Sequence, residues 1–190
     1  HMSFMSAAEL HISDIPCFVT RSGYTGEDGV EFSVPVDAAE DVARLLLDEP
    51  EVEAAGLGSR DSLRLEAGLC LYGSDITETT TPTEAGLLWS ISKRRREEGG
   101  FPGAAVIQQQ IADGAPRKRV GIKPDGKAPA RAHTEIADQD GNVIGEITSG
   151  GFSPTLGGPI AMGYVDAAHA AKGTNVNLMV RGKAMPAQVT

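Results

Sequence analysis

The chain has few aromatic side chains, only two cysteines and no long apolar run. Aromatic residues make up 5% of its 190 residues, and the two cysteines are Cys17 and Cys70. Two cysteines supply neither a disulfide framework nor, by themselves, a zinc site. No apolar stretch approaches the ~20 residues of a membrane-spanning helix, and we see no secretory signal at the start. We therefore expect a folded protein of a reducing compartment, with no metal site.

Basic residues are also scarce. The chain has 17 Lys and Arg against 26 Asp and Glu, a net charge of −9. Binding to nucleic acid in general, or to an anionic membrane, needs an excess of basic residues, so we expect neither partner. The charge is uneven along the chain: residues 1–92 carry four basic and 17 acidic groups, whereas residues 93–190 carry 13 basic and nine acidic groups.

The predicted domain boundary lies where the charge changes sign. Residues 93–100 comprise one lysine, three arginines, two glutamates and two glycines. A charge run that ends in two glycines is typical of an exposed connection between folded units. We therefore predict one domain over residues 1–98 and a second over residues 99–190.

Hydrophobic periodicity predicts a mixture of helices and strands in the first half. Apolar and polar residues alternate between residues 30 and 36, which is typical of a half-buried strand and places Glu31 opposite its apolar face. We expect Asp37 and Ser59 to cap helices, and residues 81–84 combine a capping residue, a proline and a glutamate that favour a short helix. The predicted strands are 17–21, 30–36 and 87–91, and the predicted helices are 38–47, 60–67 and 104–112.

From residue 117 onward the pattern indicates β-structure alone. Short apolar strands follow one another with glycines between them, which predicts a small barrel or a sandwich. Asp140-Gly141 and Arg181-Gly182 are typical of hairpin turns. The fold class of the chain is therefore α+β. The predicted strands are 117–123, 133–137, 142–148, 160–165, 174–180 and 184–189.

Two segments are rich in groups that bind ligands. A glycine-rich loop, residues 22–29, precedes the strand that carries Glu31, and Arg60 is expected at the start of a helix. A carboxylate accepts hydrogen bonds from ring N–H and amino groups, whereas a guanidinium binds a carboxylate through two N–H groups. Together they suit a ligand with an amide-like ring edge and an anionic tail. A structural ion pair beside a turn is the alternative.

Other common catalytic patterns are missing from the sequence. It contains no Walker phosphate-binding loop, no His-Glu-x-x-His and no Gly-x-Ser-x-Gly, which excludes three familiar site types. The histidines are far apart in sequence and lack paired ligands nearby. We therefore assign no catalytic residue and no metal ligand within this 190-residue sequence.

Six motifs resemble the aminomethyltransferases, which are the T-proteins of the glycine cleavage system. The resemblance extends from about residue 15 to residue 190 and preserves the order and spacing of the family. Dimethylglycine and sarcosine dehydrogenases, which are related folate-dependent proteins, share some of these motifs. The motifs occupy residues 24–29, 60–68, 81–87, 148–150, 161–165 and 180–183.

The resemblance implies a fold, a reaction and two ligand-binding residues. It implies the second half of an antiparallel-sheet α/β folate-binding domain, followed by a small C-terminal β-barrel. Members of the family transfer a one-carbon unit from the aminomethyl-lipoyl arm of H-protein to tetrahydrofolate and release ammonia. By resemblance, Glu31 contacts the pterin ring of tetrahydrofolate, and Arg60 binds the glutamyl carboxylate.

The family chain is nearly twice as long as this one. The segment that carries the family's catalytic aspartate has no counterpart here, so we expect a C-terminal fragment that is inactive alone. Two alternatives are a non-catalytic folate-binding or assembly module, and the folate domain of a dimethylglycine or sarcosine dehydrogenase-like protein. The resemblance implies either the bacterial cytoplasm or the mitochondrial matrix.

Overall fold

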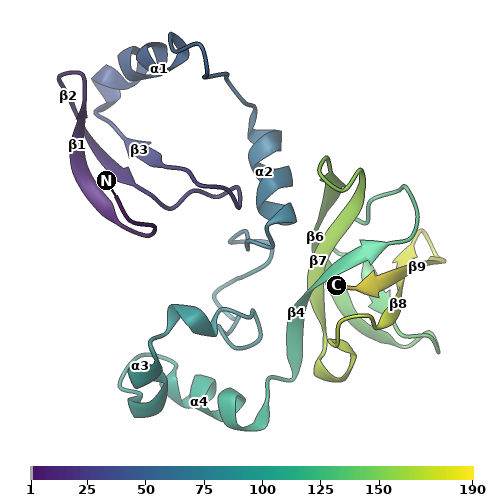
Figure 1. Cartoon of the computed structure of the whole chain (residues 1–190). Helices are drawn as coiled ribbons and strands as arrows, with labels where there is room; N and C mark the ends of the chain where they lie inside the picture. Colours follow the sequence, from purple (N-terminus) through teal and green to yellow (C-terminus); the bar gives the residue numbers. More distant parts are fainter. Residues whose placement is uncertain (1) are drawn as a thin grey trace. The chain divides into compact units, whose positions relative to one another are not determined.

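The computed structural model describes residues 2–190 and divides into two compact units, one ending at Leu69 and the other spanning Cys70 to Thr190 (Figure 1). These units are defined by their compactness. The domain boundary at 98/99, which follows from the charge pattern, stays a prediction. The fold class is confirmed: helices and antiparallel strands occur together, and the second unit contains a closed barrel.

The first unit contains a three-stranded antiparallel sheet in the order β1-β2-β3. Its strands are β1 (Ala7–Ile12), β2 (Ile15–Thr20) and β3 (Glu31–Ser33). On one face, Leu10 pairs with Cys17 and Val19 pairs with Phe32. On this face the residues of the central strand are buried, whereas those of the edge strands remain partly exposed: Val19 is 3% exposed but Phe32 is 40% exposed. Because side chains alternate along β3, Glu31 points to the opposite face, as predicted.

The predicted strand over residues 30–36 is shorter than expected. It ends at Ser33, and a 3₁₀-helix, η1 (Val36–Ala38), follows Pro35. A proline has no N–H for the strand ladder, which accounts for the early end. Strand β1 is an element that the sequence analysis did not predict.

Two helices complete the first unit, α1 (Ala39–Leu47) and α2 (Leu57–Glu66). Both were predicted, and α1 begins within one residue of its predicted start, but neither predicted cap is observed. The residue before α1 is Ala38, with no side-chain cap, so Asp37 does not cap it. Helix α2 begins after Gly56 rather than at Ser59, because the extended backbone of Gly56 already permits the first turn. Arg60 therefore lies one turn inside α2.

Residues 70–116 of the second unit form short helices and turns. They include η2 (Leu88–Ser90), α3 (Lys93–Glu98) and α4 (Ala104–Asp113). Helix α4 agrees with the prediction. The predicted strand 87–91 is wrong: its central residues form η2, and the apolar side chain of Trp89 is 72% exposed.

The predicted exposed linker at residues 93–100 is wrong for its first six residues, which form α3. The Ser92 hydroxyl accepts a hydrogen bond from the backbone N–H of Arg95 and caps the helix. Two pairs at i,i+4 spacing, Lys93–Glu97 and Arg94–Glu98, lie along its exposed surface. Charges that look like a solvated run in sequence thus neutralise one another on a helix.

The rest of the second unit is a closed six-stranded antiparallel barrel in the order β4-β7-β6-β5-β8-β9. All six predicted strands are confirmed, and the barrel rather than the sandwich is observed. Its core is formed by aliphatic side chains, including Ile136, Ile147 and Leu178, each with no exposed surface. The strands are β4 (Arg117–Pro124), β5 (Glu135–Ala137), β6 (Val143–Ser153), β7 (Gly158–Asp166), β8 (Asn175–Val180) and β9 (Lys183–Val189), with η3 (Ala167–His169) after β7.

Turn chemistry closes two of the barrel hairpins as predicted. Arg181 and Gly182 both have positive φ, at 52° and 74°, as a two-residue type I′ connection requires. At the other turn, Gly141 has φ +87°, and a carboxylate oxygen of Asp138 accepts hydrogen bonds from the N–H groups of Asp140 and Asn142.

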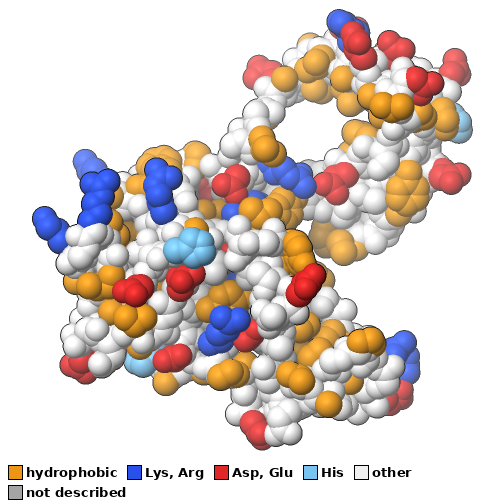
Figure 2. Space-filling model, turned by 180° about the vertical axis from the view of Figure 1, so that it is seen from behind, with side chains coloured by type: hydrophobic (Ala, Val, Ile, Leu, Met, Phe, Trp, Pro, Cys, Tyr) orange, Lys and Arg blue, Asp and Glu red, His pale blue; other side chains and the backbone are white. Residues whose placement is uncertain are grey.

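Hydrophobic side chains are exposed on each unit. Figure 2 shows them as orange patches among acidic and basic side chains. On the first unit, Phe18 is 48% exposed and Leu10 is 43% exposed, and on the barrel Phe152 is 52% exposed. Large apolar side chains at the surface often mark interaction sites when they gather.

Candidate ligand-binding site

Glu31 and Arg60, which are 29 residues apart in sequence, meet in the first unit. Glu31 is the first residue of β3 and Arg60 lies on α2. The Nη2 atom of Arg60 donates a hydrogen bond to Oε1 of Glu31 across 3.2 Å, and the two side chains are 47% and 49% exposed. The structure therefore brings together both predicted site residues and leaves each accessible to solvent.

The ring of Tyr24 supports the Arg60 guanidinium. The guanidinium carbon lies 4.7 Å from the centroid of the ring, within the range of a cation–π interaction. Tyr24 belongs to the glycine-rich loop, residues 22–29, which precedes β3. Arg60 is thus held from one side by a carboxylate and from another by an aromatic face.

An ion pair closes the base of this loop. Arg21 donates two hydrogen bonds to the Asp28 carboxylate, at 2.8 and 2.6 Å. The hydrogen bond to Asp28 raises the pKa of Arg21, and the same bond lowers the pKa of Asp28. Both groups are charged at neutral pH, so the two ends of the loop remain joined.

Gly26 places the loop tip against the end of α2. Its φ is +82°, and a Cβ built on it would lie 2.6 Å from the Cβ of Ala67. An L-residue is strained at this φ, and any side chain would meet Ala67. Glycine at this position is therefore needed both for the turn and for the close approach to the helix.

Arg64, one turn after Arg60, has a structural role. It is only 3% exposed. Its Nε donates to Oδ1 of Asp61 at 2.8 Å, and its Nη1 donates to the carbonyl oxygen of Leu69 at 3.3 Å. Arg64 is therefore held by an acidic neighbour on the preceding turn and by a backbone carbonyl.

Glu31 and Arg60 present an acceptor and a donor side by side at the surface. A half-exposed carboxylate can accept ring N–H or amino groups, and the neighbouring guanidinium can donate to a carbonyl or carboxylate oxygen. Because the two side chains touch, they contact the same end of a ligand unless they move apart. This geometry suits a heterocycle with an amide-like edge or a carboxylate.

A second polar cluster lies in the second unit, around Glu84 and Arg117. Glu84 is 5% exposed and receives hydrogen bonds from Nε and Nη2 of Arg117 at 3.0 and 3.1 Å. It also accepts from the backbone N–H of Thr81 at 2.9 Å, while the Thr81 hydroxyl accepts from the N–H of Glu84 at 3.2 Å. The capping box at residues 81–84 is therefore present, but it closes a single turn rather than a helix.

Opposing effects set the pKa of Glu84. Burial would raise it, but the hydrogen bonds from Arg117 and from the Thr81 N–H outweigh burial and lower it. The guanidinium of Arg117 also lies over the ring of Tyr164, 4.6 Å from the centroid. Burial raises the pKa of Tyr164 to about 12, so its hydroxyl stays protonated at neutral pH and donates to the carbonyl oxygen of Asp75 at 2.7 Å.

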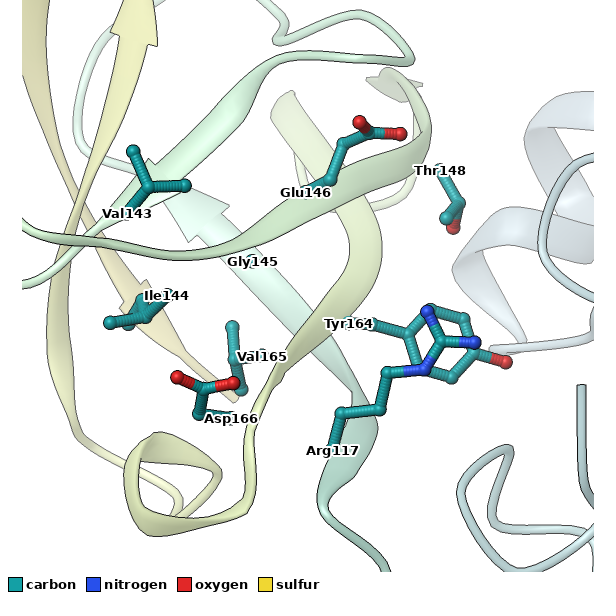
Figure 3. Close-up of a pocket in the computed structure, with 9 residues that line it drawn as sticks. All are labelled: Arg117, Val143, Ile144, Gly145, Glu146, Thr148, Tyr164, Val165 and Asp166. Carbon is teal, nitrogen blue, oxygen red and sulfur yellow. The ribbon is translucent and has the colours of Figure 1, made fainter.

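A cavity of about 410 Å³ opens beside Arg117 on the barrel (Figure 3). The guanidinium of Arg117 lies across the Tyr164 ring in this view, and aliphatic side chains form the opposite part of the lining. Arg117 and Asp166 are directly paired across β4 and β7. The lining residues are Arg117, Val143, Ile144, Gly145, Glu146, Thr148, Tyr164, Val165 and Asp166.

Asp75 is a buried carboxylate that the sequence analysis missed. It is 1% exposed, and it accepts hydrogen bonds from the Thr148 hydroxyl at 2.5 Å and from the N–H of Leu71 at 2.9 Å. Its signal in sequence was indirect, because its partners Thr148 and Tyr164 belong to motifs singled out there but Asp75 itself does not. Arg117 was missed because it appeared as one of several basic residues at the start of a strand.

Residues 2–190 contain neither a metal-binding cluster nor a membrane-spanning helix. No group of three or more His, Cys, Asp or Glu side chains in this part of the chain is placed to hold a metal ion. Among the same residues, no helix has both the length and the apolar character needed to cross a bilayer.

Two family models match the chain. The GCVT N-terminal domain matches residues 1–95, and the glycine cleavage T-protein C-terminal barrel domain matches residues 117–190. The second match coincides with the six barrel strands.

Curated relatives and a solved structure are also similar. The mitochondrial aminomethyltransferase of Mesembryanthemum crystallinum is 57% identical over 95% of this chain and 45% of the relative. That of Gallus gallus is 54% identical over 100% of this chain and 48% of the relative. A crystal structure of the glycine cleavage system aminomethyltransferase T from Bartonella henselae matches with a TM-score of 0.92 and 47% identity, over 99% of this chain and 51% of that one. The chain spans about half the length of the curated relatives it matches.

Proposed function

Because the chain belongs to the GCVT N-terminal domain family, whose model matches half of its residues, we propose that it forms the C-terminal part of a folate-dependent aminomethyltransferase. The complete enzyme would transfer a one-carbon unit from the aminomethyl-lipoyl arm of H-protein to tetrahydrofolate and release ammonia. The observation that carries the proposal is the meeting of Glu31 and Arg60 at 3.2 Å on an accessible surface.

Tetrahydrofolate is the proposed ligand of this pair. Its pterin edge carries a carbonyl oxygen beside ring and amino N–H groups, which complements a guanidinium beside a carboxylate. Glu31 would accept from the ring. Arg60 would bind the glutamyl carboxylate if its side chain swings away from Glu31, or the ring carbonyl if the two side chains stay together.

Two ligands separate these roles of Arg60. Tetrahydrofolate and a tetrahydropterin without the glutamyl tail are titrated into wild-type and Arg60→Ala protein. If Arg60 binds the glutamyl tail, the substitution weakens the binding of tetrahydrofolate alone. If Arg60 binds the ring, the substitution weakens the binding of both ligands. Unchanged binding of both would contradict the proposed site.

We propose that this chain alone does not catalyse the one-carbon transfer. It covers only 45–48% of the relatives named above, and we assign no catalytic acid or base to it. An assay with lipoylated H-protein, tetrahydrofolate and the purified chain is expected to show no transfer above the rate without enzyme. Reproducible turnover would overturn this part of the proposal.

A non-catalytic folate-binding or assembly module is the second candidate, because Glu31 and Arg60 can bind a ligand while we assign no catalytic acid or base among the described residues. Folate binding by this chain, together with no transfer when H-protein and the rest of an aminomethyltransferase are supplied, would support the module. Restored transfer under the same conditions would support the enzyme. The alternative of a dimethylglycine or sarcosine dehydrogenase-like protein would require a flavin domain in a longer polypeptide.

The proposed partners are lipoylated H-protein and tetrahydrofolate, with no nucleic acid and no membrane among them. The proposed location is the mitochondrial matrix or the bacterial cytoplasm, since the relatives above include mitochondrial proteins and one from a bacterium. Fractionation of the source cells, with an antibody to the barrel, would decide between them.

A further inference from the structure

The Arg60 side chain needs support if it is to bind a ligand in a fixed orientation. It is 47% exposed, and its contact with the Glu31 carboxylate is a single hydrogen bond of 3.2 Å. A long arginine side chain loses much rotamer freedom when it is held, so one exposed ion pair fixes it poorly. A second contact that restrains the guanidinium is the ring of Tyr24, 4.7 Å away.

We infer that Tyr24 is a positioning residue that holds Arg60 for the ligand. The inference rests on the proposed function of Glu31 and Arg60. The ring covers one face of the planar guanidinium, and Glu31 takes one of its N–H groups. The opposite face and the remaining N–H groups can then meet a ligand in an orientation that is already set when the ligand arrives.

Tyr24 can act in this way because its own loop is fixed at two points. The Arg21–Asp28 ion pair joins the two ends of the loop through two hydrogen bonds. At the tip, Gly26 approaches the Cβ of Ala67 so closely that no side chain fits. The loop is therefore attached at the end of the same helix that carries Arg60, so ring and guanidinium keep their relation.

This arrangement explains why a glycine-rich segment accompanies the charged pair. A flexible loop would let the ring leave Arg60, and the affinity that a preorganised guanidinium provides would be lost. The loop acts through Arg60 and does not need to touch the ligand. Its effect on Arg60 should thus depend on the aromatic ring, which phenylalanine retains.

Two substitutions at Tyr24 test the ring directly. Tyr24→Phe keeps the ring, whereas Tyr24→Leu removes it, and Phe152→Leu serves as a control that removes an exposed ring from the barrel. The first readout uses no folate: the NMR signal of the Arg60 Nε–H group, which the ring current displaces. We expect the displacement to persist in Tyr24→Phe and in the control and to vanish in Tyr24→Leu.

The second readout is the dissociation constant for tetrahydrofolate, with thermal unfolding measured alongside. Loss of an exposed cation–π contact corresponds to about a 2- to 5-fold weakening, which we expect for Tyr24→Leu alone, at an unchanged melting temperature. An unchanged dissociation constant in Tyr24→Leu, with a weakened one in Arg60→Ala, would overturn the positioning role and leave the folate site standing. If Arg60→Ala also binds normally, the proposed folate site itself fails.

Gly26 provides an independent test of the loop attachment. Gly26→Ala should displace the tip and reduce the Arg60 signal shift, and adding Ala67→Gly should restore part of it, because the second change removes the contacting Cβ. The strain of the positive φ would remain in the double variant. A Gly26→Ala protein with the wild-type Arg60 signal would overturn the role of the loop.

Discussion

Two arginines one helical turn apart on α2 have opposite surroundings. Arg60 is half-exposed beside Glu31 and Tyr24, whereas Arg64 is buried and is bound by Asp61 and the Leu69 carbonyl. Sequence spacing alone places both on one face of the helix. Burial separates the one that can bind a ligand from the one that stabilises the fold.

Arg64→Ala should lower stability. The change removes hydrogen bonds made by a charged donor, which are worth about 1.5–3 kcal/mol in total when the partner remains in place. The acidic partner Asp61 is 64% exposed and can be hydrated, so the loss should stay near the lower end. Urea unfolding of wild type and Arg64→Ala measures it, with Arg44→Ala, an exposed arginine on α1, as the control. A loss no larger than that of the control would contradict the structural role.

Glu84 should make the free energy of unfolding depend on pH in the acid range. Its pKa is lowered in the folded chain, so its contribution is complete above the unfolded value of about 4.3 and is lost as the pH falls through the lower folded value. Glu84→Gln should cost about 1–2 kcal/mol at pH 7, because the partner Arg117 is partly exposed. The Glu84→Gln variant should also lose less stability than wild type as the pH falls below about 4.3.

Urea unfolding at pH 7 and at about pH 3 measures both effects. Glu78→Gln is the matched control, since Glu78 is exposed in the same unit. Parallel pH profiles for wild type and Glu84→Gln would show that the Glu84–Arg117 pair does not contribute.

At the level of elements, backbone approach in the barrel depends on particular glycines. A Cβ at Gly145 would lie 1.9 Å from the carbonyl oxygen of Tyr164, and one at Gly163 would lie 2.3 Å from that of Glu146. At these two glycines the backbones of β6 and β7 therefore approach so closely that a side chain would not fit between them. Glycine is frequent in this chain partly for this reason, and not only for turns.

Gly145→Ala should destabilise the barrel by about 3 kcal/mol or more, since the clash is with backbone rather than with a movable side chain. Gly158→Ala is the control on β7: no atom lies within 4 Å of its added Cβ. Thermal unfolding of the two variants should differ by many degrees. Equal melting temperatures would show that the strands move apart at little cost.

Sequence patterns predicted the barrel strands well and residues 70–100 poorly. In β8 and β9, alternation of buried and more exposed side chains coincides with strand pairing. Residues 87–91 also alternate, but Trp89 is exposed and the segment turns into η2. The charged residues 93–98 form helix α3, because Ser92 caps the helix and charged side chains along it form ion pairs. Local signals decide such segments only when tertiary contacts agree with them.

The candidate site was predicted in composition but not in geometry. Glu31 and Arg60 stand out as a carboxylate after a glycine-rich loop and an arginine near a helix start, and the resemblance assigns them to folate. The 3.2 Å contact between them depends on how β3 meets α2, which no local pattern contains. Asp75 escaped notice because burial, rather than residue type, distinguishes it, and Arg117 because its partner Glu84 lies 33 residues away in sequence.

At the level of the whole molecule, the two units together expose more surface than two separate compact bodies of their sizes. The accessible surface of the chain is 12125 Å². Two separate compact bodies of the sizes of its units would expose about 10,300 Å². The excess includes apolar side chains such as Phe18 and Leu10 on the small sheet. Such surface favours association.

The two units should differ in amide protection. The small sheet has two unpaired edges, in β1 and β3, whereas the barrel strands form a closed ring with no edge. Hydrogen exchange at low concentration should therefore show slower exchange in β6 and β7 than in β2. Sedimentation at increasing concentration should show a rising mass as sheet edges associate. A monomer at every concentration, with uniform protection along the chain, would contradict this expectation.

If Arg60, beside Glu31, binds tetrahydrofolate, replacing it must weaken that binding. The dissociation constant of tetrahydrofolate for wild type, Arg60→Ala, Arg60→Lys and Arg64→Ala decides this. We expect a loss of about 1–3 kcal/mol for Arg60→Ala, a partial recovery for Arg60→Lys because lysine lacks the planar fork, and wild-type affinity for the folded fraction of Arg64→Ala. Normal binding by Arg60→Ala together with weakened binding by Arg64→Ala would contradict this role of Arg60.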